Sequence, residues 1–217
     1  MQVTTRTYDI VIWGATGFTG RLVMAYMAKT YGVDGEIKWA VAGRNAAKLA
    51  DVKREILGAD AENLPEVVAD SNDEASLRKL VSDTKVVCTT VGPYALYGST
   101  LVALCAELGT HYCDLTGEVQ WMRQMIEAHQ ATAEASGAKI VHTCGFDSIP
   151  SDLGTYFVQR EMHKAHGVYA PRVKYRVVGS KGGVSGGTVA SMMNMMEEAN
   201  ANPEILDIIA DPYALNS

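Results

Sequence analysis

Three evenly spaced glycines directly after an apolar run constrain the fold of this chain more than any other feature. Residues 8–20 read YDIVIWGATGFTG, with glycine at positions 14, 17 and 20. Glycine permits a sharp exit from a strand, close approach of a bound anion, and close packing of the next helix. The stretch therefore predicts a strand, a phosphate-binding loop and a helix. Because the spacing is GxxGxxG and not GxGxxG, a plain tight turn is the alternative.

Short apolar runs alternate with longer amphipathic ones over the first two thirds of the chain. The apolar runs predict strands, and the segments between them carry apolar residues at helical spacing. The predicted strands are 8–13, 37–43, 65–70, 85–92, 111–115 and 139–145, and the predicted helices are 19–31, 46–57, 73–81, 99–108 and 118–135. Strands joined by helices pair in parallel through right-handed crossovers. The fold class is therefore α/β, with a Rossmann-type doubly wound parallel sheet.

The pattern changes after Gly145, which predicts a second domain. Residues 151–165 are expected to form a helix, 169–180 alternate as in a half-exposed strand, and a glycine-rich turn precedes a helix over 188–200. We expect a nucleotide-binding domain over 1–147 and the start of a substrate and dimerisation domain over 148–217. One strand cannot form a sheet, so this second α/β domain is incomplete. Either the chain is part of a longer protein or a partner completes the sheet; we expect a homodimer through this domain.

Composition excludes several classes of protein. The net charge of −6 and the pI near 5.4 give no reason to expect a nucleic-acid partner. The N-terminus lacks a secretory signal, and no apolar run approaches the roughly 20 residues of a membrane span. The four cysteines form no CxxC pair, which predicts free thiols and a cytoplasmic protein. The HKAH stretch at 163–166 lacks a third ligand, so no metal site is expected.

The glycine loop is the first part of a predicted dinucleotide site. Backbone amides at the start of the helix, together with the positive end of its dipole, would face a pyrophosphate, and two threonines could add hydroxyl donors. The residues expected to bind the cofactor here are Gly14, Thr16, Gly17, Phe18, Thr19 and Gly20.

The end of the second predicted strand favours NADP over NAD. NAD sites usually place an acidic residue there to accept from the ribose 2′-hydroxyl. This chain has Arg44 and Asn45 at that position and Lys48 one turn later. A guanidinium is a planar donor suited to a phosphate, whereas a carboxylate would repel it. A solvated start of the second helix is the alternative for these side chains.

The ends of the third and fourth strands supply the remaining predicted cofactor contacts. Asp70 is placed to meet the adenine edge, and Val91, Gly92 and Pro93 to approach the nicotinamide half, because ligands bind at the carboxyl ends of parallel strands. A capping aspartate and a turn glycine are equally compatible with the sequence.

Hydride transfer would also need a proton source in the same crevice. Asp147 and Tyr94 are the residues we predict for catalysis, although Asp147 could instead cap the next helix. Other candidates are Tyr97, Asp114, Glu118, Cys144 and Ser148, of which Cys144 is more typical of core packing. No tyrosine is followed four residues later by lysine, which excludes the YxxxK pair of short-chain dehydrogenases.

Two features beyond the crevice have a structural interpretation. SGGT at 185–188 could bind an anionic group, but a flexible hairpin turn is favoured. The methionines at 192, 193, 195 and 196 are expected to pack against further structure or a partner chain and not to form a site.

The order of GATGFTG, AGRN, TTVGPYALYG, HYCDLTGE and HTCGFDSIPSDLG resembles the saccharopine dehydrogenase-like oxidoreductases, including the trans-acting enoyl reductase branch. The resemblance covers nearly the whole chain. It implies an NAD(P)-dependent oxidoreductase with a Rossmann domain followed by an α/β substrate and dimerisation domain. Members run well beyond 217 residues, so this chain resembles an N-terminal part.

These observations predict an NADP-dependent oxidoreductase that transfers a hydride to a C=N, C=O or C=C bond of a small or acyl-linked substrate. The alternatives are a non-catalytic NAD(P)-binding or scaffold protein and a saccharopine dehydrogenase proper.

Overall fold

A six-stranded parallel sheet forms the centre of the computed structural model, which describes residues 6–216. The strands are β1 (Tyr8–Trp13), β2 (Trp39–Gly43), β3 (Glu66–Val68), β4 (Thr84–Thr89), β5 (His111–Cys113) and β6 (Ile140–Val141). They are arranged in the order β3-β2-β1-β4-β5-β6. The chain order reverses between β1 and β4, where an open α/β sheet has its ligand crevice. The predicted fold class is confirmed.

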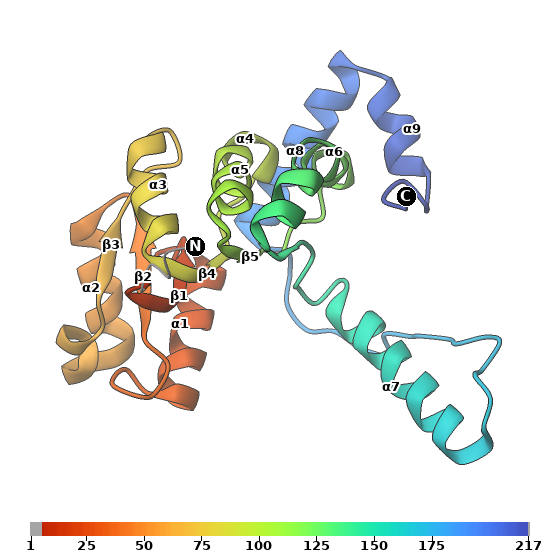
Figure 1. Ribbon diagram of the computed structural model, residues 1–217, viewed down its shortest axis with the longest axis horizontal. Helices are drawn as coiled ribbons and strands as arrows, with labels where there is room; N and C mark the ends of the chain where they lie inside the picture. Colours follow the sequence, from red (N-terminus) through yellow and green to blue (C-terminus); the bar gives the residue numbers. More distant parts are fainter. Residues whose placement is uncertain (1–5, 217) are drawn as a thin grey trace.

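Helices cover both faces of this sheet (Figure 1). They are α1 (Phe18–Tyr31), α2 (Ala46–Leu57), α3 (Glu74–Ser82), α4 (Tyr94–Tyr97), α5 (Ser99–Leu108) and α6 (Val119–Ser136), with a 3-10 helix over Gly58–Asn63. One apolar core joins α1 and α2 to the sheet around Met24, Trp39 and Leu49, all of them buried. A second core joins α3, α5 and α6 to the opposite face around Leu80 and Trp121. Both cores lie within the predicted nucleotide-binding domain.

The second part of the chain is helical. It contains α7 (Ile149–His166), α8 (Gly186–Ala201) and α9 (Glu204–Ala210). Helix α7 projects away from the sheet, and a long connection without regular structure runs back from its end (Figure 1). No residue of α7 is buried, and it exposes Tyr156 and Phe157 by more than half.

The strand predicted for residues 169–180 was wrong. That segment contains no strand in the described chain, and Val178 is 98% exposed. Alternating side chains make a strand only when another backbone pairs with it, and residues 6–216 offer none here. The turn at its start is held instead by Gln159, whose side chain bonds to both the amide and the carbonyl of Ala170.

Candidate functional site: a dinucleotide cavity closed by α8

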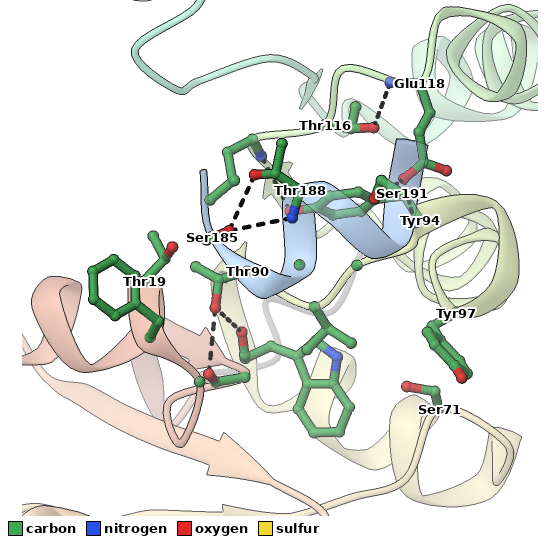
Figure 2. A pocket seen from close by; sticks show the side chains of 18 of the residues that line it. Thr19, Ser71, Thr90, Tyr94, Tyr97, Thr116, Glu118, Ser185, Thr188 and Ser191 are labelled. Carbon is green, nitrogen blue, oxygen red and sulfur yellow. Dashed lines mark hydrogen bonds between the residues drawn. The ribbon is translucent and has the colours of Figure 1, made fainter. Parts of the chain in front are cut away.

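A cavity of about 500 Å³ lies at the carboxyl ends of the parallel strands. Its walls come from the glycine loop, from the residues after β2, β3, β4 and β5, and from one side of α8 (Figure 2). Segments far apart in the sequence therefore meet around one space. This is where the doubly wound topology places a dinucleotide.

The glycine loop has the shape that the spacing predicted. Gly14 has φ +89°, and a Cβ there would lie 2.6 Å from Val91 Cγ2. Thr90, on the neighbouring strand end, donates to the Gly14 carbonyl at 3.3 Å and fixes the turn (Figure 2). Neither a side chain nor a negative φ is compatible with that position.

The other loop residues divide between lining and packing. Thr16, Gly17, Phe18 and Thr19 line the cavity together with Gly14. Gly20 is not part of the lining: a Cβ on it would lie 2.2 Å from the Gly14 carbonyl oxygen, so its role is to bring α1 against the loop. The three glycines thus provide a turn, an open approach and close packing.

The three residues predicted to recognise a phosphate have different roles in the structure. Arg44 lines the cavity, and within residues 6–216 it forms no ion pair. The Asn45 side chain accepts from the Lys48 amide at 2.9 Å and caps the start of α2. Lys48 does not reach the cavity wall. Arg44 is therefore the one of the three whose side chain is placed for a phosphate.

Of the predicted contacts after β3 and β4, Asp70, Val91 and Gly92 line the cavity and Pro93 does not. The Asp70 carboxylate accepts from the Asn72 amide at 2.9 Å, which orders the turn beside Arg44. A Cβ on Gly92 would lie 3.3 Å from the Tyr94 ring and 3.4 Å from Ser191 Oγ, so the backbone passes close beneath α8.

The two residues predicted for catalysis differ in their accessibility. Asp147 is exposed and lines the cavity just before α7. The Tyr94 ring lines it too, but the residue is only 4% exposed and its hydroxyl donates to the Thr89 carbonyl at 3.4 Å. Burial, followed by the nearby Asp114 charge, raises the pKa of the Tyr94 phenol. A raised pKa makes this phenol a weaker acid, and its burial leaves Asp147 as the more accessible side chain of the pair.

The remaining crevice candidates fall into two groups. Tyr97 and Glu118 line the cavity, whereas Asp114, Cys144 and Ser148 do not. Asp114 is buried behind the wall, where its carboxylate accepts from the Tyr112 hydroxyl and from the amides of Thr116 and Thr143. His142 Nδ1 lies 2.7 Å from the same carboxylate. Asp114 therefore organises the ends of β5 and β6.

Glu118 is a buried carboxylate that joins three parts of the wall. Its two oxygens accept from the amides of Tyr94 and Ala95, each at 2.8 Å. Ser191 of α8 donates to Oε1 at 2.7 Å (Figure 2). Three donors compensate the desolvation of this charge, and they tie α8 to the loop after β4.

Helix α8 and its cap supply a large part of the wall that the sequence did not predict. Ser185 caps the helix by accepting from the Thr188 amide at 3.2 Å, so the hairpin favoured for SGGT was wrong. Ser185, Thr188 and Ser191 line the cavity with Met192 and Met195, while Met193 and Met196 are not part of the lining. Two of the four methionines therefore line the cavity and two do not, a difference that their near-continuous run could not reveal. Thr90, Thr116 and Gly117 also line the cavity and were not predicted.

The described part of the chain contains neither a cluster of metal-binding side chains nor a membrane-spanning helix. Among residues 6–216, no three acidic, cysteine or histidine side chains are grouped to hold a metal, and His163 of the HKAH stretch stacks on Tyr169. None of the helices in that range is long and apolar enough to cross a membrane.

The fold, the glycine loop and the free Arg44 at the second strand together define an NADP-binding domain of the Rossmann class. The sequence model described as "Saccharopine dehydrogenase NADP binding domain" matches residues 10–141. The chain belongs to this family, and NADP is its cofactor. The loop fits that group, because Gly17 lines the cavity without a side chain that would fill it, and the Arg44 cation lines the same cavity.

Curated relatives agree with this assignment. A Mycobacterium tuberculosis protein is 41% identical over 216 residues, and the trans-acting enoyl reductase of Mycobacterium leprae is 40% identical over 213 residues. These alignments cover 100% and 98% of this chain but only 51% and 50% of the relatives. The chain thus spans about half the length of the curated relatives it matches.

A solved structure agrees with the fold. Apo saccharopine dehydrogenase (L-Glu forming) from Saccharomyces cerevisiae matches with a TM-score of 0.57 at 18% identity, over 73% of this chain and 32% of that one. Identity this low supports the shared fold alone.

Proposed function

We propose that this chain is the cofactor-binding part of an NADP-dependent oxidoreductase that reduces the C=C bond of an acyl-linked substrate. The observation that carries the proposal is a single cavity lined both by the NADP loop and by the methionine-bearing side of α8. The enoyl reductase names of relatives near 40% identity favour C=C over C=N and C=O.

The residues of the chain have separate roles in this proposal. NADPH, when bound, supplies a hydride. The amides of the glycine loop hold the pyrophosphate, and Arg44 pairs with the 2′-phosphate. Asp147 provides the proton that the second carbon of the double bond takes up, and Tyr94 holds the wall through its buried ring. Helix α8, held by Glu118, excludes water from the cavity.

The test is oxidation of NADPH by the full-length protein in the presence of α,β-unsaturated thioesters of N-acetylcysteamine. We expect turnover with wild type and a loss of at least about tenfold in kcat for Asp147→Asn, with NADPH affinity retained. Oxidation of NADPH with imine-forming mixtures of an amino acid and a keto acid, but not with the thioesters, would favour a saccharopine-type reaction. Tight NADPH binding without turnover of either class would favour a non-catalytic protein.

We further propose a homodimer through residues 148–217. The support is the projecting α7, whose apolar Tyr156 and Phe157 are exposed by more than half. Light scattering of the full-length protein tests it: Tyr156→Glu with Phe157→Glu is expected to give monomers, and a wild-type monomer refutes it.

A further inference from the structure

The side of α8 that lines the cavity carries hydroxyl side chains near the start of the helix and methionines after them. Ser185, Thr188 and Ser191 are spaced by three residues and line the cavity along the first turns. Met192 and Met195 follow on the same side and line the cavity one turn further on. Residues three and four apart share a helix side, so hydroxyls lead into methionines along one wall.

The methionines of this wall are available to a ligand. Met192 is 46% exposed although it lines a cavity, and Met195 is half-buried. An unbranched thioether side chain adapts to an apolar partner of variable shape, and exposed apolar surface in a cavity gains free energy when a ligand covers it.

The wall is fixed in place by bonds made by other residues. Ser191 donates to the buried Glu118 carboxylate, and Gln120 donates to Glu198 at 3.0 Å. Ala199 is buried against the rest of the protein. Because these contacts hold α8 without Met192 or Met195, the two methionines can change without releasing the helix.

We propose that Met192 and Met195 are the specificity-determining residues that receive the acyl chain of the substrate, an inference that rests on the proposed acyl-linked function. In this arrangement the acyl chain of the substrate lies along Met192 and Met195. Its thioester end lies toward the hydroxyl-bearing first turns of α8 and the loop after β4. Length discrimination among acyl chains therefore resides in α8 and not in the nucleotide-binding loops.

The test measures binding of saturated acyl thioesters of N-acetylcysteamine to the full-length protein loaded with NADPH. Saturated thioesters have no C=C bond to reduce, so the measurement is independent of the proposed turnover. We expect affinity to rise from butanoyl to dodecanoyl in wild type. Met192→Gln and Met195→Gln should together weaken dodecanoyl binding by about tenfold or more while butanoyl binding changes little.

Matched controls lie on the same helix. Met193→Gln and Met196→Gln alter methionines that are 58% and 61% exposed and do not line the cavity. They should leave affinity for every chain length within about twofold of wild type. Unchanged NADPH affinity and unchanged thermal midpoints in all four variants show that the fold is intact.

Three results would overturn the inference: no chain-length dependence in wild type, equal effects of the two methionine pairs, or loss of NADPH binding in the Met192 and Met195 variants. Failure of the proposed function looks different. In that case acyl binding depends on Met192 and Met195, yet no unsaturated thioester oxidises NADPH.

Discussion

At the scale of single residues, Gly20 is a position where one added side-chain atom would clash with backbone. A Cβ there would lie 2.2 Å from the Gly14 carbonyl oxygen and 2.8 Å from Ala15 Cα, both backbone atoms. Because backbone cannot move aside as a side chain can, Gly20→Ala should lower the free energy of unfolding by about 1–3 kcal/mol. Urea denaturation and NADPH titration measure the effect, and NADPH affinity should fall as well.

Gly154 provides the control for that substitution. It lies inside α7, and nothing is within 4 Å of the position where its Cβ would be. Gly154→Ala should leave NADPH affinity unchanged and preserve stability, since alanine favours a helix more than glycine does. Equal losses in the two variants would contradict the packing role of Gly20.

The second prediction at this scale concerns Arg44, which lines the cavity without an ion-pair partner in the described chain. Arg44→Glu should weaken NADPH binding by at least about tenfold and affect NADH much less, because a carboxylate repels the 2′-phosphate. Lys48→Glu, off the cavity wall, should have the smaller effect. Fluorescence titrations with both nucleotides decide, and equal losses for NADPH and NADH would exclude phosphate recognition by Arg44.

At the scale of elements, the residue that caps α2 can be tested for a structural role as opposed to a cofactor-binding role. Asn45 was predicted to bind cofactor, but its side chain accepts from the Lys48 amide. Asn45→Ala should therefore cost about 1 kcal/mol of stability, and Asn45→Asp should restore it, because aspartate caps as well as asparagine. Thermal unfolding checks both variants. NADPH affinity should fall only for Asn45→Asp, whose charge lies next to Arg44. If Asn45→Ala lowered NADPH affinity by more than its loss of stability explains, Asn45 would be a cofactor-binding residue after all.

Helix α8 gives the next prediction. Ser191→Ala removes the hydroxyl that joins α8 to Glu118, while the two amides that bond to that carboxylate remain. We expect faster hydrogen exchange in α8 with unchanged protection in α5, whose residues belong to the core. Uniformly faster exchange across both helices would instead indicate global destabilisation.

Elements were predictable from sequence where their cause is local or periodic. The six strands of the sheet follow from apolar runs and the glycine loop, and Gly109 and Gly137 end α5 and α6 in the left-handed conformation. The strand over 169–180 was not predictable, because alternation does not reveal whether a partner strand exists. The role of α8 was hidden for a related reason: Thr188 and Met195 reach the cavity only through tertiary packing.

At the scale of the whole molecule, the two cores and the glycine loop lie in one part of the chain, whereas the projecting α7 and the cavity-lining α8 lie in the other. Residues 10–141 match the family, and both apolar cores fall in or next to that range. Stability is therefore concentrated in the nucleotide-binding domain, whereas the surface that we propose selects a substrate comes from α8. Such a separation would let one cofactor scaffold serve different substrates through changes in a later helix.

The pH dependence of stability is a property of the same domain. Asp9 accepts from Lys85 of β4 and from the Lys38 amide next to β2, and these bonds hold the pKa of the Asp9 carboxyl below its ordinary value. A carboxyl whose folded-state pKa is lowered stabilises the protein above its unfolded pKa and loses that contribution as pH falls through the folded value.

Asp9→Asn should therefore be less stable than wild type at neutral pH, and the two should converge below about pH 4. The difference should be at most about 1 kcal/mol, since the Asp9 side chain is 31% exposed and Lys85 60%. Urea denaturation across this range, at low and high salt, measures it, with the surface variant Asp60→Asn as control. A difference that stayed constant down to the most acid pH would mean that the lost contact stabilises through its shape and not through the Asp9 charge.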